Sequence, residues 1–317
     1  MSKVGFIMFT TSGNRVSLNK ARMLIQRRRN IGLLFVLPAA LYMLLFVGYP
    51  IISNFILSFQ DVTVQTINKV DKPFIGVDNY VKLLGDPILG KSVVNTFVFT
   101  IGSIVFQFII GFALALLFNK KFRFAKPVRG LMMIPWMIPI TITGLMFKFM
   151  FTSNVGIFNE MLKGIGLAPV DWLFQTNTAM PALIFANIWI GIPFNMILLS
   201  TGLTTIPEEL YESASIDGAS KVQSFFKITL PMLKPAIESV LVLGFIYTFK
   251  VFDLVYVMTN GGPVDSTQML STYSYKLSFS LFRYSEGATV ANILFVILFF
   301  VSLIYIRYFN RDSAEVE

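Results

Sequence analysis

Six long apolar segments, separated by polar stretches, dominate the pattern of this chain. Each is long enough for a helix that crosses a bilayer, which takes about 20 residues. The pattern therefore predicts an all-α, polytopic membrane protein with six transmembrane helices. The first segment is overlong, and we expect it to bend or leave the membrane near Pro50. The six segments are residues 31–59, 92–118, 128–151, 179–202, 236–258 and 287–308.

The composition agrees with a membrane setting and excludes several kinds of chemistry. Hydrophobic residues make up 55% of the chain, charged residues 14%, and the mean hydropathy is +0.70, far from the norm of soluble domains. The chain has no Cys and no His. These absences exclude disulfides and metal sites built from thiolates or imidazoles. They also exclude cysteine nucleophiles and acid–base catalysis by histidine.

The net charge of +9 by itself suggests a nucleic-acid partner. The positions of the charges along the chain argue against one. Basic residues without any acid precede the first segment and also separate the second from the third, whereas the 60–91 loop is balanced. The positive-inside rule then predicts that both termini and the 202–235 loop are cytoplasmic. The two basic clusters are Lys3, Arg15, Lys20, Arg22, Arg27, Arg28 and Arg29, and Lys120, Lys121, Arg123, Lys126 and Arg129.

This pattern divides the chain into three parts. Residues 1–30 form a basic cytoplasmic segment, residues 31–309 form the six-span transmembrane domain, and residues 310–317 form a cytoplasmic tail. The N-terminus is not a cleavable signal, because its apolar run is too long and no small-residue cleavage site follows. A partly disordered tail with residues 4–9 as a surface anchor is the alternative for the first part.

The polar loop before the fifth segment predicts two short helices around a tight bend. Pro207 suits a first helical position, and the acidic residues that follow it favour a helix N-terminus. We expect Gly218 to adopt a positive φ that ends the first helix, and Ser220 to cap the second. Pro231 and Pro235 are expected to end that second helix. A solvated hairpin linking two spans is the plain alternative.

Residues of this loop resemble the EAA loop of ABC-importer permeases, whose pattern is E-A-A-x3-G-x9-I-x-L-P. Only the middle alanine differs, since Ser213 replaces it. The resemblance implies a type I ABC importer permease fold in which a coupling loop, residues 207–231, seats cytoplasmic helices in a groove of the ATPase subunit. The matching ATPase-coupling residues are Glu212, Ser213, Ala214, Gly218, Ile228, Leu230 and Pro231.

Further motifs resemble the sugar-type permeases of bacterial ABC importers, the maltose and glycerol-phosphate class, and they extend over residues 31–309. Such subunits are multi-pass proteins of the bacterial cytoplasmic membrane. The motifs are Leu37-Pro38-Ala39, Tyr49-Pro50, the run from Phe74 to Tyr80, Asn95-Thr96, Pro135-Trp136, the run from Asn187 to Pro193, and the run from Thr259 to Pro263.

Polar side chains within the spans are candidates for a substrate site, because lipid burial is costly for them. Asn187, Gly191 and Phe194 share one helix face, and an amide beside aromatic rings suits a carbohydrate. Alternatively, Asn187 bonds a neighbouring helix and the aromatic rings pack. The resemblance implies that the substrate site contains Asn187, Ile190, Gly191, Phe194, Gly244, Tyr247, Thr248 and Val251.

The resemblance implies a non-catalytic permease subunit that translocates a carbohydrate, an oligosaccharide first of all. Its expected partners are a second homologous permease, two ATPase subunits that bind the ATP, an extracytoplasmic solute-binding protein and membrane lipids, with no nucleic acid, metal or cofactor. A glycerol-phosphate-like or other polar solute is the alternative substrate. An ion-coupled transporter would need midplane coupling groups and internal repeats, and an intramembrane enzyme would need catalytic groups that we do not find.

Two smaller features have plain explanations. Lys250 and Asp253 stand three residues apart and are expected to form an ion pair, with contact to a polar substrate as the alternative. Residues 85–92 match the phosphate-binding pattern G-x4-G-K-S. That chemistry needs a buried strand before the loop, whereas residues 78–84 predict a short surface helix, so we interpret the match as chance.

Overall fold

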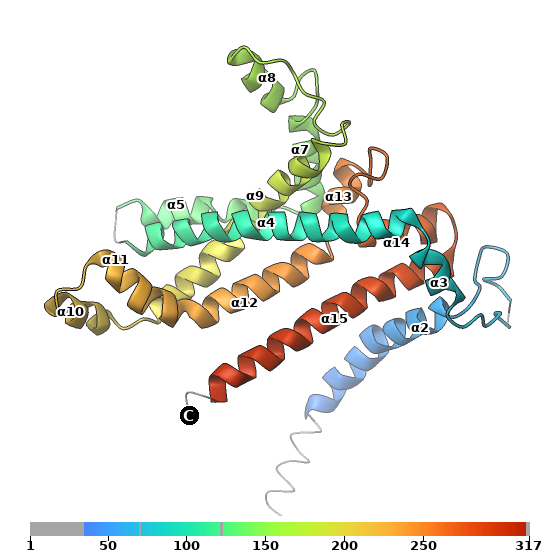
Figure 1. The fold of residues 1–317 in the computed structure, drawn as a ribbon, viewed down its shortest axis with the longest axis horizontal. Helices are drawn as coiled ribbons and strands as arrows, with labels where there is room; N and C mark the ends of the chain where they lie inside the picture. Colours follow the sequence, from blue (N-terminus) through green and yellow to red (C-terminus); the bar gives the residue numbers. More distant parts are fainter. Residues whose placement is uncertain (1–34, 70, 121–122, 315–317) are drawn as a thin grey trace, which may run out of the picture. The chain divides into compact units, whose positions relative to one another are not determined.

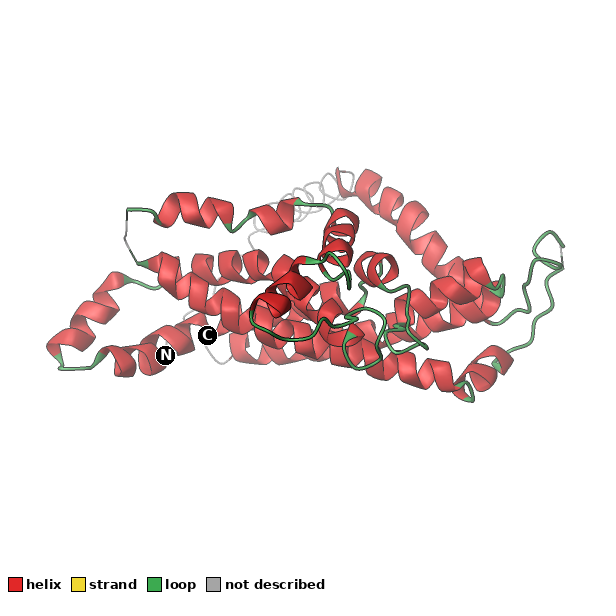
Figure 2. Cartoon of the chain, turned by 90° about the horizontal axis from the view of Figure 1, so that it is seen from above, coloured by secondary structure: helices red, strands yellow, loops and turns green. Residues whose placement is uncertain are grey.

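The structure is a computed structural model that describes residues 35–69, 71–120 and 123–314. Every extended regular element in these ranges is a helix (Figure 2). Five helices are long and apolar enough to cross a membrane, and a bent pair makes a sixth candidate. The predicted all-α membrane architecture is confirmed. The basic segment 1–30 lies outside the described residues.

The chain divides into two compact units, residues 1–56 and 57–317. The described part of the first unit belongs to a single apolar helix, Phe35–Ser58. A π-helical turn, η1 (Leu44–Gly48), comes directly before α2 (Tyr49–Ser58). The helix continues through Pro50. The wider π turn offers room for the proline ring, which otherwise clashes with the preceding turn.

Three long helices of the second unit pack against one another. They are α4 (Pro87–Asn119), α9 (Ala179–Thr204) and α12 (Leu230–Phe249), and α15 (Tyr284–Ala314) packs on α12 (Figure 1). Residues 92–118, 179–202 and 287–308, expected as spans, fall within α4, α9 and α15. The predicted surface helix before α4 is α3 (Asp78–Leu84). Since α3 and no strand precedes residues 85–92, the phosphate-loop match is indeed chance.

The third predicted span, residues 128–151, is not one straight helix. It comprises α5 (Ala125–Leu131), α6 (Ile134–Met137) and α7 (Ile140–Met150), and the two halves meet at 94°. Pro139 causes the break, because the residue before a proline is driven to extended backbone; Ile138 has φ −82° and ψ 131°. Beyond the bend, α7 leads to α8 (Ile157–Gly164), which projects from the long helices (Figure 1).

The fifth predicted span also differs at both ends. A continuous helix of 29 residues, Lys221–Phe249, joins α11 (Lys221–Ser224), η2 (Phe225–Thr229) and α12. The expectation that Pro231 and Pro235 end a short helix is therefore wrong. The π turn η2 lies just before Pro231 and relaxes the clash of its ring with the preceding carbonyls. The helix ends at Phe249, and α13 (Asp253–Met258) follows as a separate element.

Small residues allow α4 and α9 to approach closely. A Cβ on Gly111 of α4 would lie 2.5 Å from Asn195 Cβ, and a Cβ on Gly191 of α9 would lie 2.2 Å from Gln107 Cδ. On each helix, a glycine thus packs against an amide residue of the other helix. Close contact of this kind is the main source of helix association in lipid, where no hydrophobic force acts between helices.

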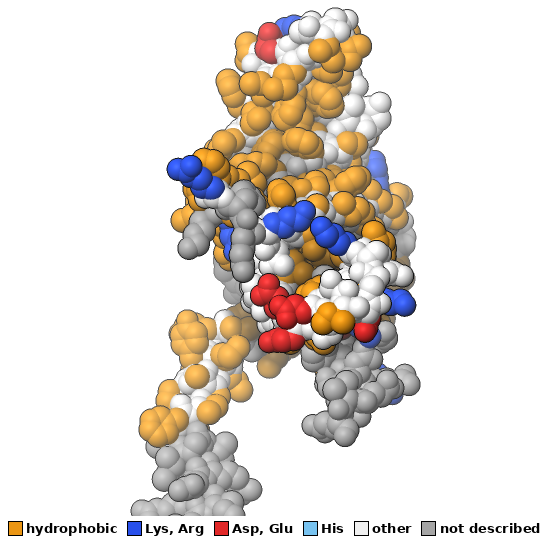
Figure 3. Space-filling view, turned by 90° about the vertical axis from the view of Figure 1, so that its left-hand side faces the viewer, with side chains coloured by type: hydrophobic (Ala, Val, Ile, Leu, Met, Phe, Trp, Pro, Cys, Tyr) orange, Lys and Arg blue, Asp and Glu red, His pale blue; other side chains and the backbone are white. Residues whose placement is uncertain are grey.

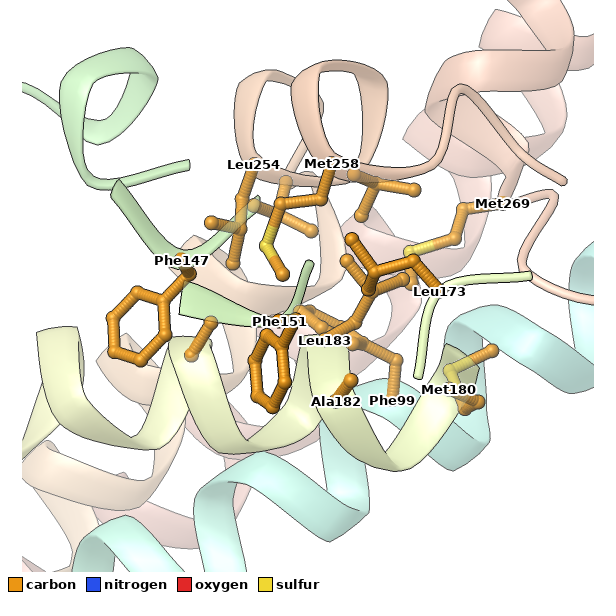
Figure 4. Packing of buried hydrophobic residues seen from close by; sticks show 13 residues of the cluster. Phe99, Phe147, Phe151, Leu173, Met180, Ala182, Leu183, Leu254, Met258 and Met269 are labelled. Carbon is orange, nitrogen blue, oxygen red and sulfur yellow. The ribbon is translucent and has the colours of Figure 1, made fainter. Parts of the chain in front are cut away.

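Apolar side chains from α4, α7, α9 and α13 meet in a hydrophobic cluster (Figure 4). This cluster fixes α7 and α13, the two elements that follow the breaks in spans three and five. Most of its members are less than a tenth exposed. They include Phe99, Phe147, Phe151, Leu173, Met180, Ala182, Leu183, Leu254, Met258 and Met269.

Polar contacts tie α3 to α15, and the N-cap of α4 to α14 (Leu270–Tyr275). Lys82 Nζ lies 2.9 Å from Glu286 Oε1, and Arg283 also pairs with Glu286. The Tyr273 hydroxyl donates to Asp86. Burial is the larger cause, and the hydrogen bond to Asp86 the second cause, of a pKa of the Tyr273 phenol above its ordinary value. At neutral pH this hydroxyl therefore keeps its proton and its hydrogen bond to Asp86. The π turn η3 (Lys276–Ser280) follows α14.

The α4–α9 contact predicts unequal effects for two glycine substitutions in the same helix. Gly111→Ala should destabilise the protein by about 1–3 kcal/mol, because the new methyl must push the two helices apart. Gly90→Ala should be neutral or slightly stabilising, since nothing lies within 4 Å of its added Cβ. Thermal unfolding in detergent measures both. Equal midpoints would contradict the role given to Gly111.

Candidate functional site

A cavity of about 520 Å³ lies where α4, α6, α9 and the end of α12 converge. All eight residues that the sequence analysis assigned to a substrate site border this one cavity. The predicted residues in its wall are Asn187, Ile190, Gly191, Phe194, Gly244, Tyr247, Thr248 and Val251; the others are Gln107, Trp136, Ile138, Ile140, Lys250, Phe252 and Asp253.

Aromatic rings form one side of the cavity. The ring centroid of Phe194 lies 6.2 Å from that of Trp136 and 6.0 Å from that of Tyr247, and the second pair is nearly perpendicular. Trp136 and Tyr247 are 55% and 57% exposed. Flat apolar surfaces of this kind can pack against a ligand while nearby polar groups orient it.

Buried polar groups form another part of the wall. Asn187 and Thr248 are each 7% exposed. Gln107 Nε2 donates to the Asn187 backbone oxygen at 2.8 Å. The Asn187 Nδ2 amide is buried without a hydrogen-bond partner in the described structure. A buried donor without a partner costs free energy.

Lys250 and Asp253 border the cavity, but the ion pair expected between them is absent from the described structure. Lys250 is the C-cap of α12, whereas Asp253 begins α13. The break between these helices removes the i, i+3 geometry that the expected pair required. The Lys250 ammonium instead lies 5.4 Å from the centroid of the Tyr247 ring, a cation–π contact.

Several cavity residues were missed by sequence reasoning. Gln107 carries the same signal as Asn187, an amide in the middle of an apolar span, and the same rule could have found it. Trp136, Ile138 and Ile140 reach the cavity only because span three bends at Pro139, so a straight span could not predict them. The Gln107 side chain lies close against Gly191, where an added Cβ would meet it.

The polar loop 207–231 folds into a bend held by hydrogen bonds. Pro207 is the N-cap of α10 (Glu208–Ile216), one position before the one predicted. Gly218 has φ +77°, as predicted. Its N–H donates to Ser215 O, and the next N–H, that of Ala219, donates to Ala214 O. These two bonds define a Schellman ending, which requires the left-handed residue that glycine supplies.

The second helix of the loop begins with the predicted cap. Ser220 Oγ accepts from Gln223 N at 3.3 Å, and Gln223 Oε1 accepts from Ser220 N at 2.7 Å, which is a capping box. The Tyr211 hydroxyl lies 2.8 Å from Thr229 Oγ1 and so ties α10 to η2. The two halves of the loop are therefore locally fixed to each other.

Exposed apolar side chains lie at this bend. Ile216, Val222 and Phe226 are 86%, 66% and 61% exposed, and acidic side chains gather beside apolar ones on this end of the second unit (Figure 3). Of the predicted coupling residues, Glu212, Ser213, Gly218 and Pro231 are exposed, while Ala214, Ile228 and Leu230 are partly buried. Ile228 packs against a cluster that contains Leu199, Leu203 and Leu233.

A set of membrane-length helices around a cavity, with a structured polar bend at one end, defines a membrane transport component. The chain belongs to the family of binding-protein-dependent transport system inner membrane components, whose family model matches residues 107–313. The predicted family is confirmed, and the protein is a multi-pass membrane protein.

Individual relatives cover nearly the whole chain. The trehalose/maltose transport system permease protein MalF of Thermococcus litoralis is 34% identical over 289 residues, which are 90% of this chain and 96% of that protein. The sulfoquinovosyl glycerol transport system permease protein SmoG of Agrobacterium fabrum is 33% identical over 88% of this chain and 90% of that protein.

A solved structure shares the fold. One chain in the crystal structure of a bacterial alginate ABC transporter, in complex with an alginate pentasaccharide-bound periplasmic protein, matches with a TM-score of 0.76 and 26% identity. The match covers 88% of this chain and 93% of that one. The type I ABC importer permease fold that was expected is confirmed.

Proposed function

We propose that this chain is a permease subunit of an ATP-driven importer that carries a carbohydrate, an oligosaccharide first of all. The observation that carries this proposal is the cavity, where aromatic rings lie beside buried amides and a hydroxyl. Sugars present apolar faces and outward hydroxyls, and this wall complements both. The relatives named for trehalose or maltose and the alginate transporter support the same substrate class.

The proposal includes partners, because one chain does not enclose the cavity. Trp136 and Tyr247 remain more than half exposed, so we assign a second, homologous permease to the open side. An extracytoplasmic protein delivers the substrate, in keeping with a binding-protein-dependent family. Two ATPase subunits bind and hydrolyse the ATP, and one of them docks on the exposed apolar residues of the bend between α10 and α11.

A polar solute with an anionic group is the second candidate substrate. Lys250 borders the cavity with no carboxylate partner in the described structure, and its ammonium could meet a phosphate or sulfonate. The relative named for sulfoquinovosyl glycerol supports this alternative. Uptake assays with neutral and anionic sugars distinguish the two candidates.

Reconstitution tests the proposed function directly. Proteoliposomes that contain this chain, the second permease and the ATPase subunits, supplied with the binding protein, should import a labelled oligosaccharide only when ATP is present. Omission of the second permease should abolish uptake, because the cavity then stays open on one side. Uptake by this chain alone, or uptake independent of ATP, would refute the proposal.

Orientation is a separate prediction, since the positive-inside rule places the bend between α10 and α11 and both termini in the cytoplasm. In this Cys-free chain, Ser220→Cys should resist an impermeant thiol reagent in intact cells, whereas Asp78→Cys should react. Both positions are exposed in the structure, so both should react once the cells are opened and the ATPase subunits are removed. Lys121, at which the same protection is predicted, lies outside the described residues. The reverse pattern of labelling would overturn the orientation.

Energy transfer through the bend predicts a specific effect of Gly218→Val. The substitution should cost about 1–3 kcal/mol because a β-branched residue resists positive φ, while its added Cβ meets nothing within 4 Å. The backbone alone is therefore disturbed. Transport and substrate-stimulated ATP hydrolysis by the assembled complex should both fall, although the protein still reaches the membrane.

The matched control is Gly218→Asn, because asparagine tolerates the left-handed region better than other non-glycine residues. This variant should retain most of the transport rate. Asn187→Ala should slow or alter substrate passage while the ATPase subunits still bind. Normal transport by an assembled Gly218→Val complex would show that the bend does not couple the two processes.

A further inference from the structure

Gln107 is a polar side chain that the fold brings into the cavity from α4, a helix that contributes none of the eight predicted site residues. Its residue is only 4% exposed, although it lies in the middle of a membrane-length helix. An amide is costly to bury at such a depth unless its hydrogen-bonding groups are satisfied. We therefore expect each hydrogen-bonding group of this amide to have a partner.

Gly191 holds this side chain at the cavity wall. A Cβ on residue 191 would lie 2.2 Å from Gln107 Cδ and 2.4 Å from both terminal atoms of the amide. The amide thus rests against the bare backbone of α9 and cannot turn toward that helix. Both residues border the cavity.

The protein satisfies only part of the amide. A glutamine side chain offers two donor hydrogens and one oxygen with two acceptor positions. Gln107 Nε2 donates once, to the Asn187 backbone oxygen, and Oε1 accepts no bond from the described residues. The acceptor Gln107 Oε1 thus stays free in a residue of the cavity wall.

We propose that Gln107 is a specificity-determining residue that binds one hydroxyl of the transported carbohydrate. A hydroxyl can donate its hydrogen to Gln107 Oε1, the acceptor that the protein leaves free. The inference rests on the proposed carbohydrate substrate and deepens it. A substrate without that hydroxyl would leave the Gln107 oxygen unpaired, and a site of this kind rejects such analogues.

A purely structural role makes a different prediction. If Gln107 served only to bond α4 to α9, its loss would slow transport of every substrate by the same factor. A role in recognition instead removes the preference for one hydroxyl. The comparison of a parent sugar with its analogues therefore separates the two roles, as a double-mutant cycle does.

The experiment uses the complete transporter with its binding protein in proteoliposomes. A panel of glucosyl di- to pentasaccharides identifies the best substrate of the wild-type complex, and analogues of that sugar lack one hydroxyl each. In the wild type, one analogue should be transported about 5- to 20-fold more slowly than the parent, as for the loss of a buried hydrogen bond. Gln107→Met, which keeps the length of the side chain, should transport parent and analogue within about twofold of each other.

The control is Ser103→Ala, one turn earlier on α4, buried and outside the cavity wall. It should retain the wild-type preference. If Gln107→Met does not assemble with its partners, Gln107→Asn answers the same question, because it keeps the amide but withdraws it by one methylene. Equal slowing of all sugars, or an unchanged preference, would overturn the role of Gln107. A wild-type complex that imports no sugar would overturn the proposed carbohydrate substrate itself.

Discussion

The close parallel contact of α4 with α9 is the interaction on which the cavity depends. Asn195 packs against Gly111, and Gln107 packs against Gly191. On each helix the glycine and the amide residue are four positions apart. A larger residue at either glycine would separate the backbones and withdraw Gln107 from Asn187. Because lipid supplies no hydrophobic force between helices, this exact fit stabilises the pair. The same contact places two amides at the cavity wall.

Much of this arrangement could be predicted from the sequence, because its signals are local. Apolar length identified the spans, and Gly218 and Ser220 identified the bend and the cap. The eight expected cavity residues needed more than local pattern. Asn187, Gly191 and Phe194 share a face that the pattern identified, but the assignment of all eight to one substrate site came from the resemblance to sugar permeases. Gln107 was not predicted as a cavity residue, although it is an amide within an apolar span, as Asn187 is. Its contact with Gly191 arises only from the packing of α4 against α9.

The errors concern proline, whose effect depends on its surroundings. Pro139 breaks span three because it drives Ile138 to extended backbone. Pro231 does not break its helix, because η2 precedes it and its five-residue hydrogen-bond spacing relaxes the clash of the ring. Composition alone cannot distinguish these cases. The charged pair Lys250 and Asp253 was misjudged for a related reason, since the helix break between them was not foreseen.

The uninterrupted helix from Lys221 to Phe249 gives the bend a direct mechanical link to the cavity. At 1.5 Å per residue its 29 residues extend about 43 Å. One end begins at the Ser220 cap, beside the proposed docking surface, and the other carries Gly244, Tyr247 and Thr248 in the cavity wall. Had Pro231 ended a separate short helix, a flexible joint would lie between the two. A continuous helix instead moves both ends together, so displacement of the bend by an ATPase subunit would shift one wall of the cavity against Gln107 and Asn187.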